Sequence, residues 1–342
     1  MNFKLLIFFA LFTSLIKGQD FQINALVSDS IFYDQRFGSS VAVYGNVAAV
    51  TASNAAEDGV RSGAVLIFEK NEKSEWEFST KLKPADSKRL LGIGAKVALA
   101  KEYVFISARG NSRRQHYGSF VYVFRKEGND WVETQMLKLE GGYQGSFGSN
   151  IEVDGNRVIV SANADLKTGT LENEKCNAFI SELAPDGLWA LTGEIKNTEL
   201  DGYQFLNQVI DLEGSHAFVN GYFEDTTAEP IWFCTMTAKD EKGKIIMKKR
   251  SPCRSIKPMT FVFTETNAGW VNTQILKPWD NEGREFGCAI SAHDGMLAVS
   301  AKHAKNTSNK SLAGKVYLYK IDANGIYQPF QIIYPKDSHY SQ

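Results

Sequence analysis

One unit of four short segments returns along the chain, and it constrains the fold more than any other feature. In residues 37–84 the unit begins with Phe-Gly-Ser-Ser-Val-Ala-Val, turns at Gly-Asn and continues as Val-Ala-Ala-Val-Thr. It then crosses a polar loop to Gly-Ala-Val-Leu-Ile-Phe and ends between Trp76 and Pro84. Each segment is apolar or alternating and is bounded by Gly, Asn, Asp or Ser, which is typical of successive antiparallel strands. The unit therefore predicts a four-stranded antiparallel sheet.

Two landmarks of this unit recur in step with each other. The opening motif returns at intervals of 56, 54, 58 and 81 residues, at Phe37, Ile93, Phe147, Phe205 and Phe286. An aromatic residue marks the head of each fourth segment, at Trp76, Trp131, Trp189, Trp270 and Tyr327. Four-stranded sheets repeated in this way are typical of a β-propeller, in which the sheets, called blades, are arranged radially. We interpret the aromatic positions as packing between adjacent blades, and a sugar-stacking platform is the alternative.

The number of blades follows from how the segments are grouped. We assign complete units to residues 37–84, 93–139, 147–197, 205–250 and 286–335, a pair of strands to 259–278, and a lone fourth strand to 21–29, which makes 23 strands. Five more strands would give seven blades of four. The sequence therefore predicts an all-β, seven-bladed propeller that is incomplete, in a single domain of residues 19–342. A six-bladed ring with irregular closure is the alternative.

These motifs resemble the FG-GAP repeat of integrin α-subunit-type propellers, over nearly all of residues 21–335. The second strands end in Val-Thr-Ala-Ser at 50–53 and Val-Ser-Ala-Asn at 160–163, where the family usually has Gly-Ala-Pro. The resemblance implies an extracellular propeller whose partners meet loops on one face. The calcium loop of that family, Asp-x-Asp-x-Asp-Gly, is missing from the sequence. Because calcium needs six to eight closely spaced oxygen ligands, we expect no metal and no cofactor.

The N-terminus predicts entry into the secretory pathway. Residues 1–18 combine Lys4, an apolar stretch at 5–16 and a cleavage point before Gln19, as in a signal peptide. An uncleaved membrane anchor is the alternative, but a span needs about 20 apolar residues. We therefore expect a protein that is secreted or held at the cell surface, without a membrane span after cleavage.

Cysteines in a secreted chain favour disulfides. Cys234 and Cys253 flank a predicted hairpin and are the candidate pair, while the bonding of Cys176 and Cys288 stays open. The chain has no Cys-x-x-Cys and no His/Cys spacing of a zinc site.

The loops between second and third strands vary most, and we expect them to form the partner-binding face. They are residues 52–62, 108–117, 162–176, 221–230 and 301–313. The last loop contains two N-glycosylation sequons, at Asn306 and Asn309. Adjacent sequons are seldom both occupied, so we expect one glycan there.

Motifs for catalysis are scarce in this sequence. It contains no Gly-x-Ser-x-Gly, no His-Glu-x-x-His and no P-loop, and none of its five histidines stands in a recognisable catalytic pattern. A net charge of −1 gives no field that would attract nucleic acid. We therefore expect a recognition or adhesion module that binds an extracellular protein or glycan and performs no catalysis. The alternative is a hydrolase or lyase with its site in the central funnel, where the predicted first strands offer only the charges of Lys96, Glu152 and Asp211.

Overall fold

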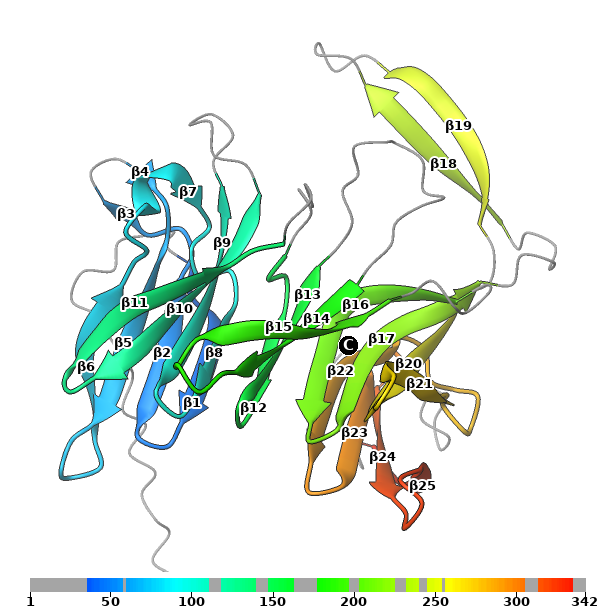
Figure 1. The fold of residues 1–342 in the computed structure, drawn as a ribbon. Helices are drawn as coiled ribbons and strands as arrows, with labels where there is room; N and C mark the ends of the chain where they lie inside the picture. Colours follow the sequence, from blue (N-terminus) through cyan, green and yellow to red (C-terminus); the bar gives the residue numbers. More distant parts are fainter. Residues whose placement is uncertain are drawn as a thin grey trace, which may run out of the picture.

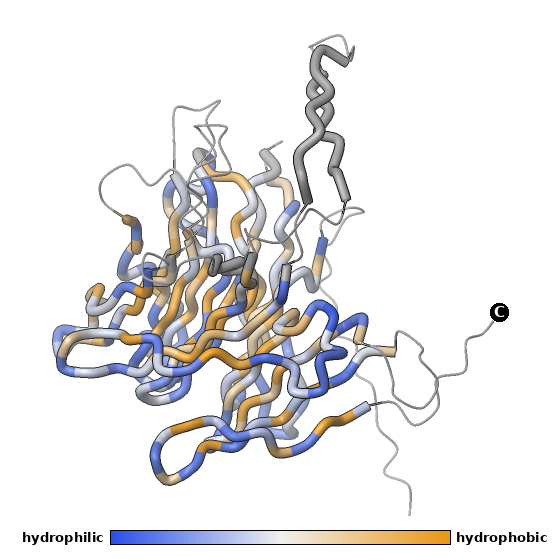
Figure 2. The backbone as a smooth tube through the Cα atoms, turned by 90° about the vertical axis from the view of Figure 1, so that its right-hand side faces the viewer, coloured by the Kyte–Doolittle hydropathy of each residue, from blue (hydrophilic) through white to orange (hydrophobic). Residues whose placement is uncertain are grey.

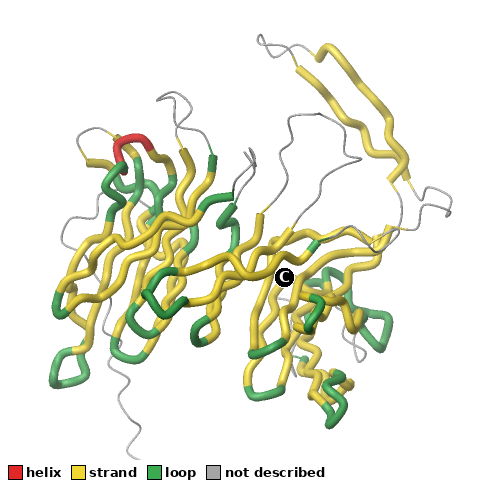
Figure 3. The backbone as a smooth tube through the Cα atoms, in the orientation of Figure 1, coloured by secondary structure: helices red, strands yellow, loops and turns green. Residues whose placement is uncertain are grey.

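The computed structural model of the chain describes residues 36–57, 60–110, 118–139, 147–162, 177–196, 203–224, 232–239, 245–253, 256–304 and 313–334. These residues form strands joined by turns, with one short 3₁₀ helix, η1 (Ser87–Arg89), in the described part (Figure 3). The predicted all-β fold is confirmed.

Five antiparallel sheets follow one another along the chain, and we call them blades 1 to 5 (Figure 1). Blade 1 contains β1 (Phe37–Tyr44), β2 (Val47–Ala52), β5 (Ala64–Lys70) and β6 (Trp76–Leu82). Blade 2 contains β8 (Val97–Ala100), β9 (Tyr103–Gly110), β10 (Ser119–Glu127) and β11 (Asp130–Leu137), with β7 (Leu90–Leu91) beside β9. Blade 3 contains β12 (Ile151–Asp154), β13 (Arg157–Ala162), β14 (Asn177–Leu183) and β15 (Trp189–Ile195). Blade 4 contains β16 (Tyr203–Glu213), β17 (His216–Glu224), β20 (Ile256–Thr266) and β21 (Gly269–Leu276). Blade 5 contains β22 (Phe286–His293), β23 (Met296–Ala301), β24 (Lys315–Ile321) and β25 (Tyr327–Ile333).

Two small ribbons stand outside the blades. One joins β3 (Ala56–Glu57) to β4 (Val60–Arg61) within the loop between the second and third strands of blade 1. The other is a long hairpin of β18 (Trp232–Lys239) and β19 (Ile245–Cys253), inserted between β17 and β20. It stands away from the blades in Figure 1.

This hairpin corrects two predictions. The unit assigned to 205–250 and the separate pair at 259–278 are wrong, because β20 and β21 are the third and fourth strands of the blade that β16 begins. The interval of 81 residues therefore contains an insertion and not a truncated blade. The step from 23 strands to seven blades depended on this grouping; in the described residues the strands form five blades and a separate hairpin. The lone strand predicted at 21–29 lies outside the described residues.

The hydrophobic core lies between blades. Along β9 and β13 almost every side chain is buried, because one face of each sheet packs on the preceding blade and the other on the following blade. Separate apolar clusters accordingly join blades 1 and 2, 2 and 3, 3 and 4, and 4 and 5. Figure 2 shows apolar residues running through the strands and polar residues gathered at the turns.

The aromatic landmarks of blades 3 and 5 pack between blades, as predicted. Trp189 lies edge-on against Tyr103 and Phe105 of the preceding blade, with ring centroids 5.4 and 4.9 Å away. Tyr327 lies in the same way against Phe218, at 5.3 Å. A fourth strand thus places its first ring over the second strand of the blade before it, where the ring is buried.

Glutamine side chains stabilise two of these contacts by hydrogen bonds. Gln135 in β11 donates from Nε2 to the carbonyl of Trp189 and accepts the N–H of Trp189 on Oε1, both at 2.8 Å. Gln274 in β21 does the same with Tyr327, at 2.8 and 2.9 Å. Each glutamine stands four residues after its own blade's head aromatic, Trp131 or Trp270. One side-chain amide therefore satisfies both backbone groups at the head of the next fourth strand.

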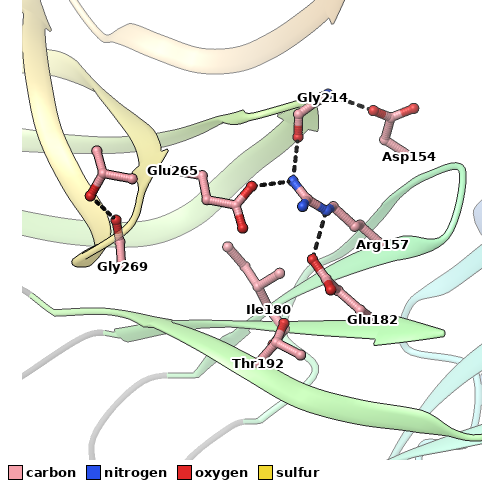
Figure 4. Close-up of polar contacts among 9 residues, drawn as sticks. Asp154, Arg157, Ile180, Glu182, Thr192, Gly214, Glu265 and Gly269 are labelled. Atoms are coloured by element: carbon pink, nitrogen blue, oxygen red, sulfur yellow. Dashed lines mark hydrogen bonds and ion pairs between the residues drawn. The ribbon is translucent and has the colours of Figure 1, made fainter. Parts of the chain in front are cut away.

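An arginine network joins blades 3 and 4 (Figure 4). The guanidinium of Arg157 lies 2.8 Å from both Glu182 on its own blade and Glu265 on blade 4, and donates to the carbonyl of Gly214 at 3.0 Å. Asp154 accepts the N–H of Gly214 at 2.6 Å. The hairpin turns of the two blades are therefore tied to each other at their ends.

A buried ion pair anchors blade 5 on the segment that precedes it. The ammonium of Lys315 lies 2.6 Å from Asp280, and the hydroxyl of Tyr317 donates to the same carboxylate at 2.7 Å. Tyr122 of blade 2 donates to Asp86 in the corresponding place, at 2.9 Å. Each aspartate follows a proline by two residues in the connection between blades.

The first strands lie side by side in the order β1, β8, β12, β16, β22. Within the described residues, β22 and β1 do not pack in this way. Consistent with an uncovered inner edge, Val41 and Val43 of β1 are 62% and 63% exposed, whereas Val97 and Leu99 of β8 are buried.

Candidate functional site

The first strands form an inner wall, and residues at one level of it can be identified from the strand pairing. In each blade, the residue at this level is the one two positions before the end of the first strand, where it pairs with the second strand. The five residues are Ala42, Ala98, Glu152, Asp211 and Ser291. Two of them are carboxylic acids, and they belong to adjacent blades.

Glu152 lies on β12, and part of its side chain is exposed to solvent. Desolvation of the carboxyl group by the surrounding protein raises the pKa of Glu152 to about 7, the negative charge of Asp211 adds to this rise, and the positive charge of Lys96 opposes it. No described residue is bonded to its carboxyl group. Near neutral pH this group therefore exists in both protonation states and is free to contact a ligand.

Asp211 is held more firmly. Its Oδ2 accepts the N–H of Ala292 from blade 5 at 2.5 Å, and its Oδ1 accepts the N–H of Leu212 at 2.8 Å. Burial raises the pKa of Asp211 to about 6; the two backbone hydrogen bonds oppose the rise, and the charges of Glu213 and Asp154 add to it. Each carboxylate oxygen has a second lone pair that can accept a further hydrogen bond. Asp211 is thus an oriented carboxylate that also fixes blade 5 on blade 4.

Lys96 lies immediately before β8 and is half-buried. Its N–H donates to Ser107 Oγ at 2.7 Å, which fixes the backbone but leaves the ammonium free to act by charge. The structure therefore brings Lys96, Glu152 and Asp211 close enough for charge to alter ionisation. Two carboxyl groups with raised pKa values are a common arrangement for general acid–base chemistry.

Hydroxyl groups near the start of the first strands have a structural role. Ser149 pairs with Ser161 at 2.8 Å, and Ser161 Oγ also accepts the N–H of Asn150 at 2.9 Å. In blade 5 the corresponding contact joins the exposed thiol of Cys288 to Ser300 at 3.1 Å. These contacts hold the turn that opens each first strand.

The other predicted sites are placed only in part. Cys234 pairs in register with Ser251, and Cys253 with Trp232, so the two cysteines occupy diagonal positions of the inserted hairpin. Their disulfide stays a prediction. Cys176, Asn306 and Asn309 lie outside the described residues, as does the predicted signal peptide at 1–18.

The described ranges contain neither a cluster of metal ligands nor a membrane-spanning helix. No group of three or more His, Cys, Asp or Glu side chains is placed to hold a metal ion in those ranges. No helix in them is long and apolar enough to cross a bilayer.

Similarity to known proteins is confined to structure. No protein-family model matches the chain, and no curated protein resembles it in sequence. A thermostable family-43 glycoside hydrolase is 12% identical, with a TM-score of 0.39 over 86% of this chain and 92% of that one. A putative 6-phosphogluconolactonase from Bacteroides fragilis is 11% identical, with a TM-score of 0.45 over 86% and 70%. An α-L-arabinofuranosidase from Lactobacillus brevis is 10% identical, with a TM-score of 0.39 over 84% and 92%.

These comparisons support a β-propeller and correct the functional expectation. A recognition module without catalysis was expected, but the solved propellers that resemble the chain are named as hydrolases and a putative lactonase, which contradicts it. At such TM-scores the likeness assigns no reaction to this chain. Its chemistry has to be argued from its own residues.

Proposed function

We propose that the chain is a hydrolase whose site lies on the inner wall, with Glu152 and Asp211 as its acid and base. The observation that carries the proposal is the pair itself: two carboxyl groups at one level of adjacent first strands, with pKa values raised to about 7 and about 6. Hydrolysis of a glycosidic bond commonly uses two such groups. A glycan is therefore the proposed substrate class.

The environments of the two groups suggest their roles. Asp211, with the lower pKa and two backbone N–H donors, acts as the carboxylate that takes a proton from a water molecule. The oxygen of that water bonds to the anomeric carbon. Glu152, with the higher pKa, gives its proton to the glycosidic oxygen as the bond to the leaving sugar breaks. One water is consumed, and one proton passes from Asp211 back to Glu152 through solvent before the next turnover.

Lys96 has a tuning role in this proposal. Its charge holds the pKa of Glu152 below the value that burial and Asp211 would otherwise produce. A larger increase in the pKa of Glu152 would keep its carboxyl group protonated up to a higher pH. Lys96 therefore sets the upper limit of the active pH range.

Four sequence-based expectations remain proposals alongside this one. The predicted signal peptide supports a secreted or cell-surface protein, which would meet glycans outside the cell. The Phe-Gly-Ser turns support an FG-GAP type of blade, although no family model matches. A disulfide between Cys234 and Cys253 and a glycan at Asn306 or Asn309 would fit the same compartment.

The test is turnover of a panel of 4-nitrophenyl glycosides and linear 1,5-α-arabinan by the full chain between pH 4 and 9. We chose arabinose-based probes because one of the structures compared above is named as an arabinofuranosidase. We expect a bell-shaped profile with limbs near the two pKa values, and loss of at least ~10²-fold in rate for Glu152→Gln and for Asp211→Asn. Ser291→Ala, at the same level of blade 5, is the matched control and should keep its rate.

A substitution of Lys96 tests the tuning role separately. Lys96→Met should move the alkaline limb to higher pH, because removing the positive charge raises the pKa of Glu152. The proposal fails if no probe is hydrolysed, or if Glu152→Gln retains the wild-type rate.

A further inference from the structure

Three charged side chains of the inner wall depart from the pattern of the repeats. At the level described above, blades 3 and 4 carry Glu152 and Asp211 where the other blades carry alanine or serine. A second level lies two residues earlier on each first strand, and its members are Ser40, Lys96, Asn150, Val209 and Ala289. Lys96 alone among these five is charged. A charge that one blade has and its counterparts lack is not required to build a blade.

The backbone of this second level is fixed in the same way in every blade. A side chain that stands 11 residues later, on the second strand, makes a hydrogen bond of 2.7–3.3 Å to the main chain of each member. In blade 2, Ser107 Oγ accepts the N–H of Lys96, and the N–H of Ser107 donates to the carbonyl of Lys96 at 3.0 Å. These bonds use the main chain of Lys96 and not its ammonium group. The charge of this side chain therefore needs another explanation than the turn.

The counterparts of Lys96 are accommodated within the protein, whereas its ammonium group has no ion pair. Ser40 Oγ accepts the N–H of Val97 at 3.2 Å, Asn150 is buried, and the other two members are apolar. Lys96 is only half-buried, and in the described part of the chain no carboxylate lies within ion-pairing distance of its ammonium group. An ammonium group has three hydrogen-bond donors. This group can therefore bind a ligand that approaches along the inner wall.

Lys96 stands at one end of a row of charges that has a direction. By the alternation of a strand it lies on the side of Ala98, which packs against blade 3, and its charge acts on Glu152 there. Asp211 follows on the next strand, and its carboxylate accepts the N–H of Ala292 from blade 5. Because β8, β12 and β16 lie side by side, the wall is positive towards blade 2 and negative towards blade 5. A ligand with one anionic group would therefore bind this row in one orientation.

We propose that Lys96 binds the anionic group of an acidic sugar, so that the substrate of this site is a glycan with carboxylate or sulfate groups. The inference rests on the proposed hydrolase site, whose substrate class it narrows. Glu152 lies between Lys96 and Asp211, and Glu152 is the group that gives its proton to the leaving sugar. The acidic sugar is accordingly the one that leaves. A net charge of −1 gives the chain no general attraction for polyanions, so a preference for acidic glycans must come from this local group.

The experiment is isothermal titration calorimetry of the full chain at pH 6. Trigalacturonic acid and its full methyl ester share their rings and linkages and differ in charge, and a sulfated galactan oligosaccharide is the third probe. We expect a charged probe to bind about tenfold more tightly than the ester, as a hydrogen bond to a charged group would produce. Added salt should reduce this preference. Preference for the acid identifies a carboxylate as the anionic group, and preference for the sulfated probe identifies a sulfate.

Variants of Lys96 assign the preference to this residue. Lys96→Met should lower the affinity for the charged probe to that for the ester, whereas Lys96→Arg, which keeps the charge, should retain most of the preference. Lys101→Met, which removes an exposed lysine at the other end of β8, is the matched control and should bind as the wild type does. A cooperative melt checks that each variant folds.

This proposal and the proposed hydrolase activity can fail separately, because the preference is measured by binding and not by turnover. Binding of a charged probe without hydrolysis would support the role of Lys96 and count against the hydrolase. Hydrolysis of a neutral arabinoside, together with charged probes that bind no more tightly than the ester, would overturn the role of Lys96 and leave the hydrolase in place. A preference for the charged probe that survives Lys96→Met would also overturn it.

Discussion

The buried pair of Lys315 and Asp280 allows a quantitative prediction, because its two partners are buried to different extents and have different other contacts. The side chain of Lys315 is 2% exposed and that of Asp280 is 20% exposed. Asp280→Ala leaves the ammonium buried without a partner and also removes the acceptor of the Tyr317 hydroxyl. Lys315→Met leaves Asp280 with Tyr317 and with the N–H of Glu282. Methionine is also what blade 4 has at the corresponding position, Met259.

The magnitude follows from these contacts. Removing one partner of a buried ion pair costs about 3–5 kcal/mol, and we take about 4 kcal/mol because water can reach the Asp280 side. With an entropy of unfolding of about 2.1 cal/mol/K per residue, a chain of this length loses about 6 °C in melting temperature. Replacing the buried charge with a well-packed apolar group is often neutral, so Lys315→Met should change the free energy of unfolding by less than about 1 kcal/mol.

The assay is a double-mutant cycle followed by thermal and urea unfolding. Asp280→Ala with Lys315→Met should recover most of the stability that Asp280→Ala loses, which gives a coupling energy of about 3 kcal/mol. Lys196→Met, which removes an exposed pair with Glu194, is the control and should have little effect. Additive single effects, or a larger loss from Lys315→Met than from Asp280→Ala, would refute the reasoning.

Three further predictions test the packing between blades and the inner wall. Gln274→Ala should lower the free energy of unfolding by about 2 kcal/mol, since two backbone groups of the next blade lose their partner. Gln328→Ala, at an exposed position, should change it very little, and urea unfolding compares the two variants. Gly193→Ala should destabilise by about 1–3 kcal/mol, because a Cβ there would lie 2.7 Å from the ring of Trp270, and a melting temperature equal to the wild type would contradict this. Glu152→Gln should have the same melting temperature as the wild type near pH 4 and a higher melting temperature above pH 7. The raised pKa of Glu152 makes the wild type lose stability as pH rises from about 4.5 through about 7. Parallel melting curves across that range would show that Glu152 ionises normally.

Much of the fold is encoded in local patterns. Five opening motifs and five head aromatics mark the five blades of the described residues, although the sequence analysis expected an incomplete seven-bladed array. Grouping the strands into blades failed because residues 232–253 form strands as blade residues do, and a local pattern does not say which strand is the partner. The pairing of β17 with β20 across this insert is a long-range choice made by packing against blades 3 and 5.

The candidate site was predictable only as a set of residues. The sequence places Glu152 and Asp211 on first strands, but their proximity depends on which blades are neighbours and on burial, which no spacing reveals. Two structural positions carried a signal that was missed. Gln135 and Gln274 each follow a head aromatic by four residues, and a comparison of the repeats at that offset would have found them.

The inserted hairpin has a consequence for how this chain can change over generations. Strands β17 and β20 pair without interruption up to Glu224 and Ile256, so the two ends of the insert meet at neighbouring points. The entropy needed to close a loop grows only with the logarithm of its length. Blade 4 therefore keeps the same register whether a few residues or a whole hairpin stand between its second and third strands. That junction is a place where the gene can gain, lose or exchange a segment while the blades around it stay as they are.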